Sequence, residues 1–318
     1  MNPPLVPDPA ANLPRIAPKV DKSEGKRIVA IVSAANRHGV REMVDWLTRH
    51  FPHQSGLNIR VASSSQHATR IAAEESFRAD IVVAVGGDGT VADVASGIFG
   101  TDVTLGIVPA GSTNITARAL GIPSDPLAAM DVLAGPSTQR VIDVGRSGER
   151  SFLNMAGAGF DAELFKAANP FWKRRLGWLA YLPAAALALR LQPSIVRVAI
   201  DGDCFETQSA LILVANGGAA VAPSFTVYPG ISVNDGWLDV LVFSASTPAE
   251  IVATLGQASL QKLDRSPHVV WRRAQTVRID ADPPLAVELD GDARGTTPRQ
   301  FTVVPGGLRV VTPLPVIE

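Results

Sequence analysis

The sequence predicts an α/β fold in two parts: an N-terminal doubly wound α/β domain followed by a C-terminal β-rich sandwich domain. Apolar runs of strand length alternate with segments of helical period from Lys26 to about Asp143, which is typical of a parallel sheet with helices on both faces. Beyond that point, short alternating runs are separated by Gly, Asp and Pro turns, as in an antiparallel sandwich. The length of 318 residues also exceeds the roughly 250 to 300 residues that one hydrophobic core usually supports.

The first part, expected to span residues 26–143, alternates strand and helix. We expect strands at 27–35, 57–64, 81–85 and 102–110, and helices at 39–51, 67–79, after Thr90, at 113–121 and at 126–135. Residues 1–25 are rich in Pro and lack the basic start and apolar core of a secretory signal. We expect them to form a disordered leader.

The second part, expected to span residues 144–318, consists mainly of short strands. Two strands are predicted around the turn at 146–149, and further strands lie within 195–217, 237–245, 268–280, 285–295 and 300–313. Helical segments are expected only at 161–191 and 248–260. We also expect the extreme C-terminus to pack back on the first domain.

Composition excludes several classes of protein. No uninterrupted apolar run approaches the ~20 residues of a membrane span, although the mean hydropathy is +0.17. The formal net charge of -1 lacks the basic excess of a duplex-binding protein, so nucleic acid is not expected as a partner. Cys204 is the only cysteine, which excludes an intramolecular disulfide and a cysteine-rich zinc site. We expect a cytoplasmic protein.

Two glycine-bearing turns follow predicted strands of the first domain. One is Gly86-Gly87-Asp88-Gly89-Thr90 and the other contains Gly111-Ser112-Thr113-Asn114. In a doubly wound sheet, ligands bind beyond the carboxyl ends of the strands, where glycines and helix N-termini expose N–H groups to phosphate. If the two strands are neighbours, the turns form one polyphosphate cradle. Each turn alone also fits an ordinary strand-to-helix connection with a helix cap.

Asp88 is unexpected in a turn suited to an anion. The chain has no G-x-x-x-x-G-K-[ST] sequence, and no Lys follows the glycines, so the charge of a phosphate has to be neutralised by another group. A carboxylate at Asp88 suits Mg²⁺, held directly or through water, or a nucleotide hydroxyl. The competing interpretation makes Asp88 a local helix cap.

Other polar motifs have simpler interpretations. Asp290 and Asp292 flank Gly291, and an Asp-Gly pair between strands is usually a hairpin turn. Asp235 and Asp239 invite the same interpretation. Residues 157–162 fit G-x-G-x-x-A, but the acidic residue expected about 20 positions later is missing, so dinucleotide binding there has little support.

Taken together, these motifs resemble the diacylglycerol kinase family, in particular the bacterial lipid kinases related to sphingosine kinases. The resemblance covers nearly the whole chain after the leader. It is carried, in order, by GGDGT, PAGSTNITARALGIP, FLNMAGAGFDA, LVANGG with NDGWLDV, and DGD in place of the family's D-G-E.

The resemblance implies phosphoryl transfer from ATP to a lipid hydroxyl at the membrane surface. ATP would contact Gly86 to Thr90 and Gly111 to Asn114, and Asp290 would accept the hydroxyl proton. Asp292 stands where the family has Glu, and the resemblance makes it a second catalytic candidate. Asp88, Asp235 and Asp239 are then the candidate ligands of Mg²⁺. Peripheral membrane contact and a homodimer are compatible with this interpretation.

The chain departs from the family pattern at several positions. Ala92 and Asp93 replace the usual Asn-Glu after the glycine loop, and Ile115 replaces the Asp of many bacterial members. NAD kinase shares GGDGT, but its separate N-E motif is absent here. A non-catalytic nucleotide- or lipid-binding regulator on the same fold is the second alternative. The aromatic and basic stretch at 171–191 suits a bilayer interface or, more simply, a packed helix pair.

Overall fold

The computed structural model describes residues 27–34, 45, 57–159, 193–217, 230–260 and 262–315. The predicted leader and the predicted helix at 161–191 lie outside these residues. So does the predicted helix at 39–51, apart from Asp45, which is helical.

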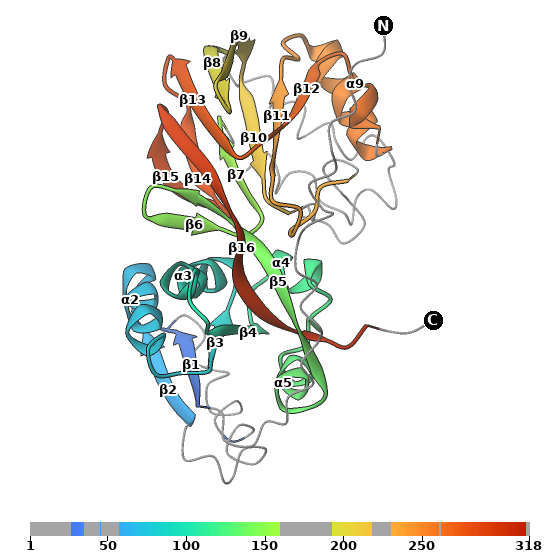
Figure 1. Ribbon diagram of the computed structural model, residues 1–318. Coiled ribbons are helices and arrows are strands. Elements are labelled where there is room, and N and C mark those ends of the chain that lie inside the picture. The colour runs from blue at the N-terminus through green and yellow to red at the C-terminus, as the bar shows by residue number, and fades with distance from the viewer. Residues whose placement is uncertain are drawn as a thin grey trace, which may run out of the picture.

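The first part of the chain contains a parallel sheet in the strand order β2-β1-β3-β4. Every residue of β3 and β4 is buried, because helices cover both faces of the sheet (Figure 1). The strands are β1 (Ile28–Ser33), β2 (Leu57–Ala62), β3 (Ile81–Gly86) and β4 (Thr104–Pro109).

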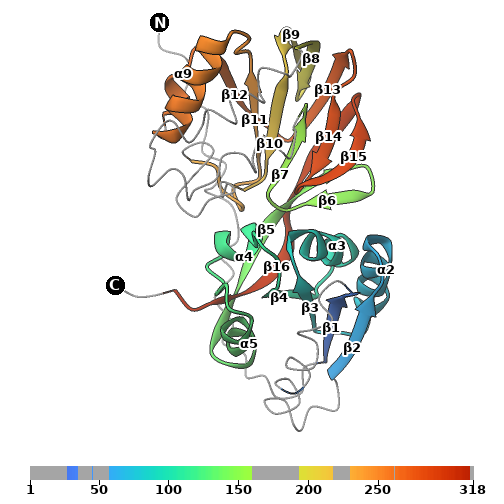
Figure 2. The ribbon, with the colours of Figure 1, turned by 180° about the vertical axis from the view of Figure 1, so that it is seen from behind.

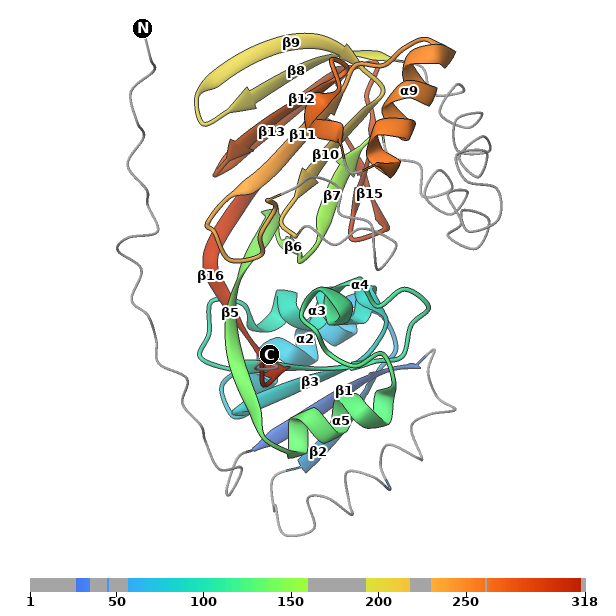
Figure 3. The same cartoon turned by 90° about the vertical axis from the view of Figure 1, so that its right-hand side faces the viewer.

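The helices lie on opposite faces of this sheet, as Figure 3 shows. Val82 and Ala84 of β3 pack in one apolar cluster with residues of α2 (Ser65–Glu75) and α3 (Asp88–Ile98). Val83 and Val85 alternate with them and pack with Met130 of α5 (Pro126–Ala134) on the other face. The predicted doubly wound α/β domain is therefore confirmed. A short helix, α4 (Ile115–Ala119), follows β4.

The second part is a sandwich of two sheets, as predicted. One sheet has the order β12-β11-β10-β7-β14-β15 and is antiparallel throughout. Its buried face packs on β8, β13 and β16 of the other sheet through apolar side chains such as Val240, Val198 and Phe301. The strands are β7 (Met155–Ala158), β8 (Ser194–Ile200), β9 (Asp203–Ser209), β10 (Leu211–Ala215), β11 (Leu238–Phe243), β12 (Val269–Ala274), β13 (Thr276–Asp282), β14 (Ala286–Leu289), β15 (Asp292–Thr296) and β16 (Arg299–Pro313).

Two long strands run from the sandwich into the α/β part, as both Figure 1 and the rear view in Figure 2 show. They are β5 (Ser137–Ser147) and β16, which pair antiparallel along most of their length. β16 pairs with β13 at one end and with β4 at the other. A single ten-stranded sheet is thus shared by both parts.

The structure corrects some predicted boundaries. Helix α3 begins at Asp88 rather than after Thr90, because Gly87 is extended and acts as its N-cap. The strand predicted at 300–313 is confirmed as β16, although its pairing with β5 shifts register at a bulge between Val304 and Leu308, where Gly306 has φ +60°. β7 is antiparallel to both neighbours, so the glycine pattern at 157–162 does not follow a parallel Rossmann strand.

Two helical segments complete the described second part. Helix α9 (Pro248–Ser259) starts with a capping box between Thr247 and Glu250. The backbone N–H groups of Ser246 and Thr247 lower the pKa of Glu250 to about 2. A 3₁₀ turn, η4 (Leu263–Arg265), follows α9. Among the described residues, no helix is both long and apolar enough to cross a bilayer.

Candidate active site

The two predicted glycine turns lie directly against each other at the carboxyl ends of β3 and β4. These strands are parallel neighbours, with Gly86 opposite Pro109, and the N–H of Ala110 donates to the Gly86 carbonyl at 2.9 Å. A Cβ atom on Gly111 would lie only 2.6 Å from the Cα of Gly87. The condition for one shared cradle, adjacent strands, is therefore met, and the close approach requires glycine.

Asn114 fixes the shape of the second turn. Its Oδ1 accepts from the N–H of Gly111 at 3.0 Å, and its Nδ2 donates to the Gly111 carbonyl at 2.9 Å. The backbone of Asn114 is in the left-handed conformation, with φ +48°, which Asn tolerates better than most residues do. Asn114 therefore holds the loop around Gly111, and the exposed Ser112 and Thr113 form its tip.

Asp88 joins the two turns. It is the first residue of α3, yet its Oδ1 accepts the N–H of Thr116 in the first turn of α4, at 3.1 Å. Asn114, the N-cap residue of α4, makes no side-chain capping bond. Asp88 is thus a helix cap, as one interpretation predicted. The helix that it caps, however, is the neighbouring α4 and not α3, to which Asp88 itself belongs.

A short hydrogen-bond chain leads from Asp88 to the sandwich. The Thr116 N–H donates to Asp88, while the Thr116 hydroxyl accepts from Nδ2 of Asn154 at 2.7 Å. The backbone N–H of Asn154 in turn donates to Oδ1 of Asp290 at 2.9 Å. The glycine cradle and Asp290 are therefore held in a fixed relation across the two parts of the molecule.

Asp290 and Gly291 form the two-residue turn of the β14–β15 hairpin. Both have positive φ, +47° and +91°, and Leu289 pairs with Asp292 across the turn. The hairpin interpretation is confirmed, and the same turn also places the Asp290 carboxylate in the interior. The carboxylate accepts the N–H groups of Leu153, Asn154 and Met155 at 2.7 to 3.0 Å.

Burial raises the pKa of Asp290 to about 6, from an ordinary value of 3.8. The three N–H donors oppose this change, and the nearby charge of Asp88 adds to it. A carboxyl group with this pKa is ionised at neutral pH and is a stronger base than an exposed aspartate.

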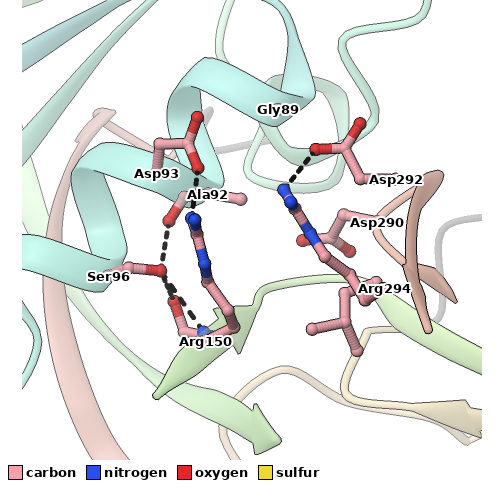
Figure 4. A pocket seen from close by; sticks show the side chains of 10 residues that line it. Gly89, Ala92, Asp93, Ser96, Arg150, Asp290, Asp292 and Arg294 are labelled. Atoms are coloured by element: carbon pink, nitrogen blue, oxygen red, sulfur yellow. Dashed lines mark hydrogen bonds and ion pairs between the residues drawn. The ribbon is translucent and has the colours of Figure 1, made fainter. Parts of the chain in front are cut away.

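A small pocket lies beside Asp290, between α3 and the sandwich (Figure 4). Its lining includes Gly89, Ala92, Asp93, Ser96, Arg150, Ser151, Leu289, Asp290, Asp292 and Arg294. On the α3 side, Oδ1 of Asp93 accepts from Arg150 at 3.1 Å and from the hydroxyl of Ser65 at 2.5 Å. On the sandwich side, Arg294 pairs with Asp292 at 2.8 Å. Burial raises the pKa of Asp93, against the effects of Ser65 and Arg150.

Two family models match the chain in succession. The diacylglycerol kinase catalytic domain matches residues 28–147, and the YegS C-terminal NAD kinase beta sandwich-like domain matches residues 154–312. The diacylglycerol kinase of Bacillus subtilis is 32% identical over 256 residues, which are 79% of this chain and 83% of that protein. The chain belongs to the diacylglycerol kinase and YegS-like lipid kinase family.

Other members of this lipid kinase family agree. A probable YegS-like lipid kinase of Pseudomonas fluorescens is 34% identical over 235 residues, 73% of this chain and 77% of that protein. A diacylglycerol kinase structure from Bacillus anthracis superposes with a TM-score of 0.69 at 21% identity, and covers 93% of this chain and 100% of that one. Another structure from the same organism gives a TM-score of 0.77 at 22% identity. At these identities the two structures show the fold alone.

The DGWLD element of this lipid kinase family lies away from the pocket, with Asp235 in the turn before β11 and Asp239 on that strand. Arg273 lies 3.2 Å from Asp235 Oδ2 and 3.5 Å from Asp239 Oδ1. Trp271 Nε1 also donates to Asp239, at 2.8 Å, and burial raises the pKa of Asp239. A guanidinium already balances both carboxylates, so a metal ion would have to displace it. Metal binding at these residues stays a prediction.

The sequence indicates Asp88 and Asp290 as site candidates, but not the residues that link them in the structure. Thr116 and Asn154 were given no role, although Asn154 lies within the FLNMAG motif. Arg150 and Arg294 were missed because no sequence spacing shows that a hairpin arginine faces α3. Asp161, in the FLNMAGAGFDA motif, lies outside the described residues.

Proposed function

We propose that this protein is an ATP- and Mg²⁺-dependent lipid kinase, which transfers the terminal phosphoryl group of ATP to a lipid hydroxyl. The observation that carries the proposal is the position of Asp290. A buried carboxylate with a raised pKa is linked by Thr116 and Asn154 to a glycine cradle that suits phosphates. Phosphoryl transfer requires a base and a phosphate site held in fixed relation.

The cradle supplies the N-terminus of α3 to the nucleotide phosphates, since that of α4 is already capped by Asp88. Helix α3 begins at Asp88, directly after Gly87, and the second turn leads into α4. N–H groups at the start of a helix lack intrahelical partners and favour an anion. Gly87 and Gly111 let the two turns pack backbone to backbone, so that the ends of both strands form one site.

Asp290 is suited to accept the proton of the acceptor hydroxyl. Its two oxygens offer about four acceptor positions, and three backbone N–H groups occupy three of them. The remaining position is on Oδ2, which accepts only the N–H of Leu153 among the described residues. The hydroxyl proton passes to this oxygen as the hydroxyl oxygen bonds to the terminal phosphorus. The bond from that phosphorus to the bridging oxygen breaks, and ADP leaves with the electron pair.

The residues present fit a Mg²⁺ ion that is shared with the nucleotide. The hydrogen bond that caps α4 engages only Oδ1 of Asp88, so Oδ2 is the oxygen suited to the ion. Within the described ranges, no group of three or more His, Cys, Asp or Glu residues could hold a metal. Mg²⁺ is commonly held by one or two carboxylates together with substrate phosphates, where it neutralises their charge.

The lipid acceptor is proposed from the family. The relatives are named diacylglycerol kinase and probable lipid kinase. By analogy, the acceptor is a diacylglycerol-like lipid with a free hydroxyl, presented at a membrane surface. Asp290 faces the pocket between α3 and the sandwich, so the hydroxyl is expected to enter there.

The proposal is tested by label transfer from γ-labelled ATP with Mg²⁺. Acceptors are mixed micelles that contain diacylglycerol, monoacylglycerol, phosphatidylglycerol, sphingosine or ceramide, and NAD⁺ is tested separately in solution. We expect label in a lipid, and a loss of at least ~10²-fold in Asp290→Asn with ATP binding retained. Asp280→Asn, an exposed carboxylate on β13, is the matched control.

Three outcomes would contradict the proposal. Label only in NAD⁺ would identify a NAD kinase-like enzyme. Nucleotide binding without any transfer would favour a binding-only regulator. Unchanged turnover in a folded Asp290→Asn would remove Asp290 as the base.

A further inference from the structure

We propose that Arg294 binds the terminal phosphoryl group of the nucleotide during transfer, and that Asp292 is the positioning residue that holds Arg294 over the first turn of α3. This inference rests on the proposed kinase function and extends it. It assigns a role to an arginine that is part of neither the glycine cradle nor the hydrogen-bond chain to Asp290.

The hairpin that carries Asp290 also presents Arg294. Asp292 and Arg294 are two residues apart on β15, so their side chains leave the strand on the same face. The Arg294 guanidinium donates to Oδ2 of Asp292 at 2.8 Å, and both residues line the pocket with Asp290. Figure 4 shows the guanidinium pointing toward the turn of α3 that carries Gly89.

The Asp292–Arg294 pair lies against the predicted phosphate site. Oδ2 of Asp292 is 3.6 Å from the position that a Cβ atom on Gly89 would occupy. Gly89 is the second residue of α3, where the backbone N–H groups point out of the helix end. A phosphate bound at this helix end would therefore lie close to the Arg294 guanidinium.

The two arginines of the pocket differ in their freedom to move to a phosphate. Arg150 donates to Asp93, whose side chain is 12% exposed, and to Ser65. Moving Arg150 would leave a buried carboxylate unpaired, which is costly. Asp292, the partner of Arg294, is 50% exposed, so water can solvate this carboxylate when Arg294 moves away. Arg294 is therefore the arginine that can turn to a ligand.

The negative charge around the pocket also favours a cation at the position of Arg294. Asp290 and Asp292 line it, Asp88 is close enough to raise the pKa of Asp290, and the glycine turn contains no Lys. During phosphoryl transfer, negative charge is spread over the three equatorial oxygens of the transferred group. A guanidinium can donate two parallel hydrogen bonds to such oxygens, which a point charge cannot match in geometry. Arg294 takes no part in the proton transfer and forms no covalent bond.

The first experiment measures steady-state transfer in Arg294→Ala and Arg294→Lys. We expect Arg294→Ala to lower kcat by about 10²- to 10³-fold, with the KM of the lipid changed less than about threefold. Added guanidinium chloride should restore part of the lost rate in Arg294→Ala but none in Asp290→Asn. Arg294→Lys keeps the positive charge but loses the planar guanidinium that donates two parallel hydrogen bonds. We therefore expect a rate between those of wild type and Arg294→Ala.

Arg278→Ala is the matched control. Arg278 also pairs with a carboxylate two residues away, Asp280, on the outer face of β13. It does not line the pocket. We expect wild-type rates and no effect of guanidinium on this variant beyond its effect on wild type.

A binding experiment gives a readout that is independent of turnover. Wild type should bind a non-hydrolysable ATP analogue more tightly than ADP, and Arg294→Ala should lose this preference while its Kd for ADP stays the same. Asp292→Asn should lower kcat by about tenfold and leave ADP affinity unchanged, because it loosens Arg294 without removing it.

The outcomes separate this inference from the proposed function. Wild-type transfer together with a fully active Arg294→Ala would overturn the role of Arg294 and leave the kinase standing. Absence of transfer in wild type would overturn the kinase. In that case, an unchanged triphosphate preference in Arg294→Ala would overturn the arginine's role too, and a lost preference would support it.

Discussion

At the scale of single residues, Asp290 shows how one dipeptide serves two purposes. The positive φ values of Asp290 and Gly291 suit the tight turn, and the same turn points the carboxylate at three backbone N–H groups. From the sequence, a hairpin turn and a catalytic carboxylate are alternative interpretations of Asp290. In the structure, the hairpin geometry is what places the carboxylate.

The raised pKa of Asp290 predicts the acidic limb of the pH profile. The carboxyl has to be ionised to accept a proton, and its pKa is raised to about 6, so kcat/KM should fall about tenfold for each pH unit below 6. Between pH 7 and 8, the ionisation of Asp290 should no longer change kcat/KM. A limb near pH 4, the ordinary range of an exposed aspartate, would contradict the buried environment described for Asp290.

The close approach of Gly87 and Gly111 makes a second prediction at this scale. In Gly111→Ala, the new Cβ would lie 2.6 Å from the Gly87 Cα and 2.9 Å from Asn114 Oδ1, so the two turns must separate. We expect about 1 to 3 kcal/mol of lost stability and at least tenfold weaker ATP binding, measured by urea unfolding and calorimetry.

Gly256→Ala is the control for that substitution. Gly256 lies within α9, and outside the backbone of that helix no atom of the described residues lies within 4 Å of the position of an added Cβ. Alanine there should leave ATP binding unchanged and stabilise the helix by up to about 1 kcal/mol. Equal loss of ATP affinity in both variants would show that the contact between the turns is unimportant.

At the scale of elements, helix α4 depends on a residue from another helix. It has only five residues, and Asp88 from the first turn of α3 accepts the N–H of Thr116. Asp88→Ala removes this cap and should cost about 1 to 2 kcal/mol, with faster hydrogen exchange at the Thr116 amide. Asp88→Asn keeps a side-chain acceptor and should keep most of this stability.

The two Asp88 variants separate capping from charge. If Asp88 also serves Mg²⁺, Asp88→Asn should weaken Mg²⁺-dependent ATP binding although the fold is kept, because the amide has lost the negative charge. Metal-independent binding of ADP should change less. Equal Mg²⁺ dependence in wild type and Asp88→Asn would leave Asp88 as a cap alone.

Local sequence signals were enough to predict most elements. The strands β3 and β4 are short apolar runs, and each ends in a glycine-bearing turn, so both strands and their turns could be predicted. The sequence predicts the start of α3 three residues late, because a Gly-Asp-Gly run is typical of a loop, while the extended Gly87 allows the helix to begin at Asp88. The capping of α4 by Asp88, which belongs to α3, could not be predicted, because it depends on how the two helices face each other.

At the scale of the whole molecule, β5 and β16 join the α/β part and the sandwich, because both strands run from one part into the other. A sequence pattern shows that β16 is a strand but not that it pairs with both β13 and β4. The buried carboxylate of Asp143 on β5 accepts the N–H of Gly306 at 2.8 Å in the bulge of β16, and that of Gly236 at 2.7 Å. Burial raises the pKa of Asp143. The bulge therefore lies at a buried polar junction between the sandwich and the α/β part.

A second polar junction joins the two parts beside the candidate active site. Arg150, on the short strand β6 (Arg150–Phe152), donates to Asp93 of α3 and to Ser65 of α2, both at 3.1 Å. Arg150→Met would leave Asp93 buried without its cation, and we expect a loss of about 3 kcal/mol in the free energy of unfolding. Because the lost contact crosses between the parts, unfolding should also become less cooperative, with separate transitions in a calorimetric scan.

A double variant distinguishes a lost ion pair from poor packing. In Asp93→Leu/Arg150→Met neither charge remains buried, so most of the lost stability should return. Arg197→Ala is the control, since its pair with Glu206 is 66% and 55% exposed, and a change within about 0.5 kcal/mol is expected. If the double variant were as unstable as Arg150→Met, the unpaired charge would not be the cause. The stability of the junction would then come from the packing of the arginine side chain between α2, α3 and β6.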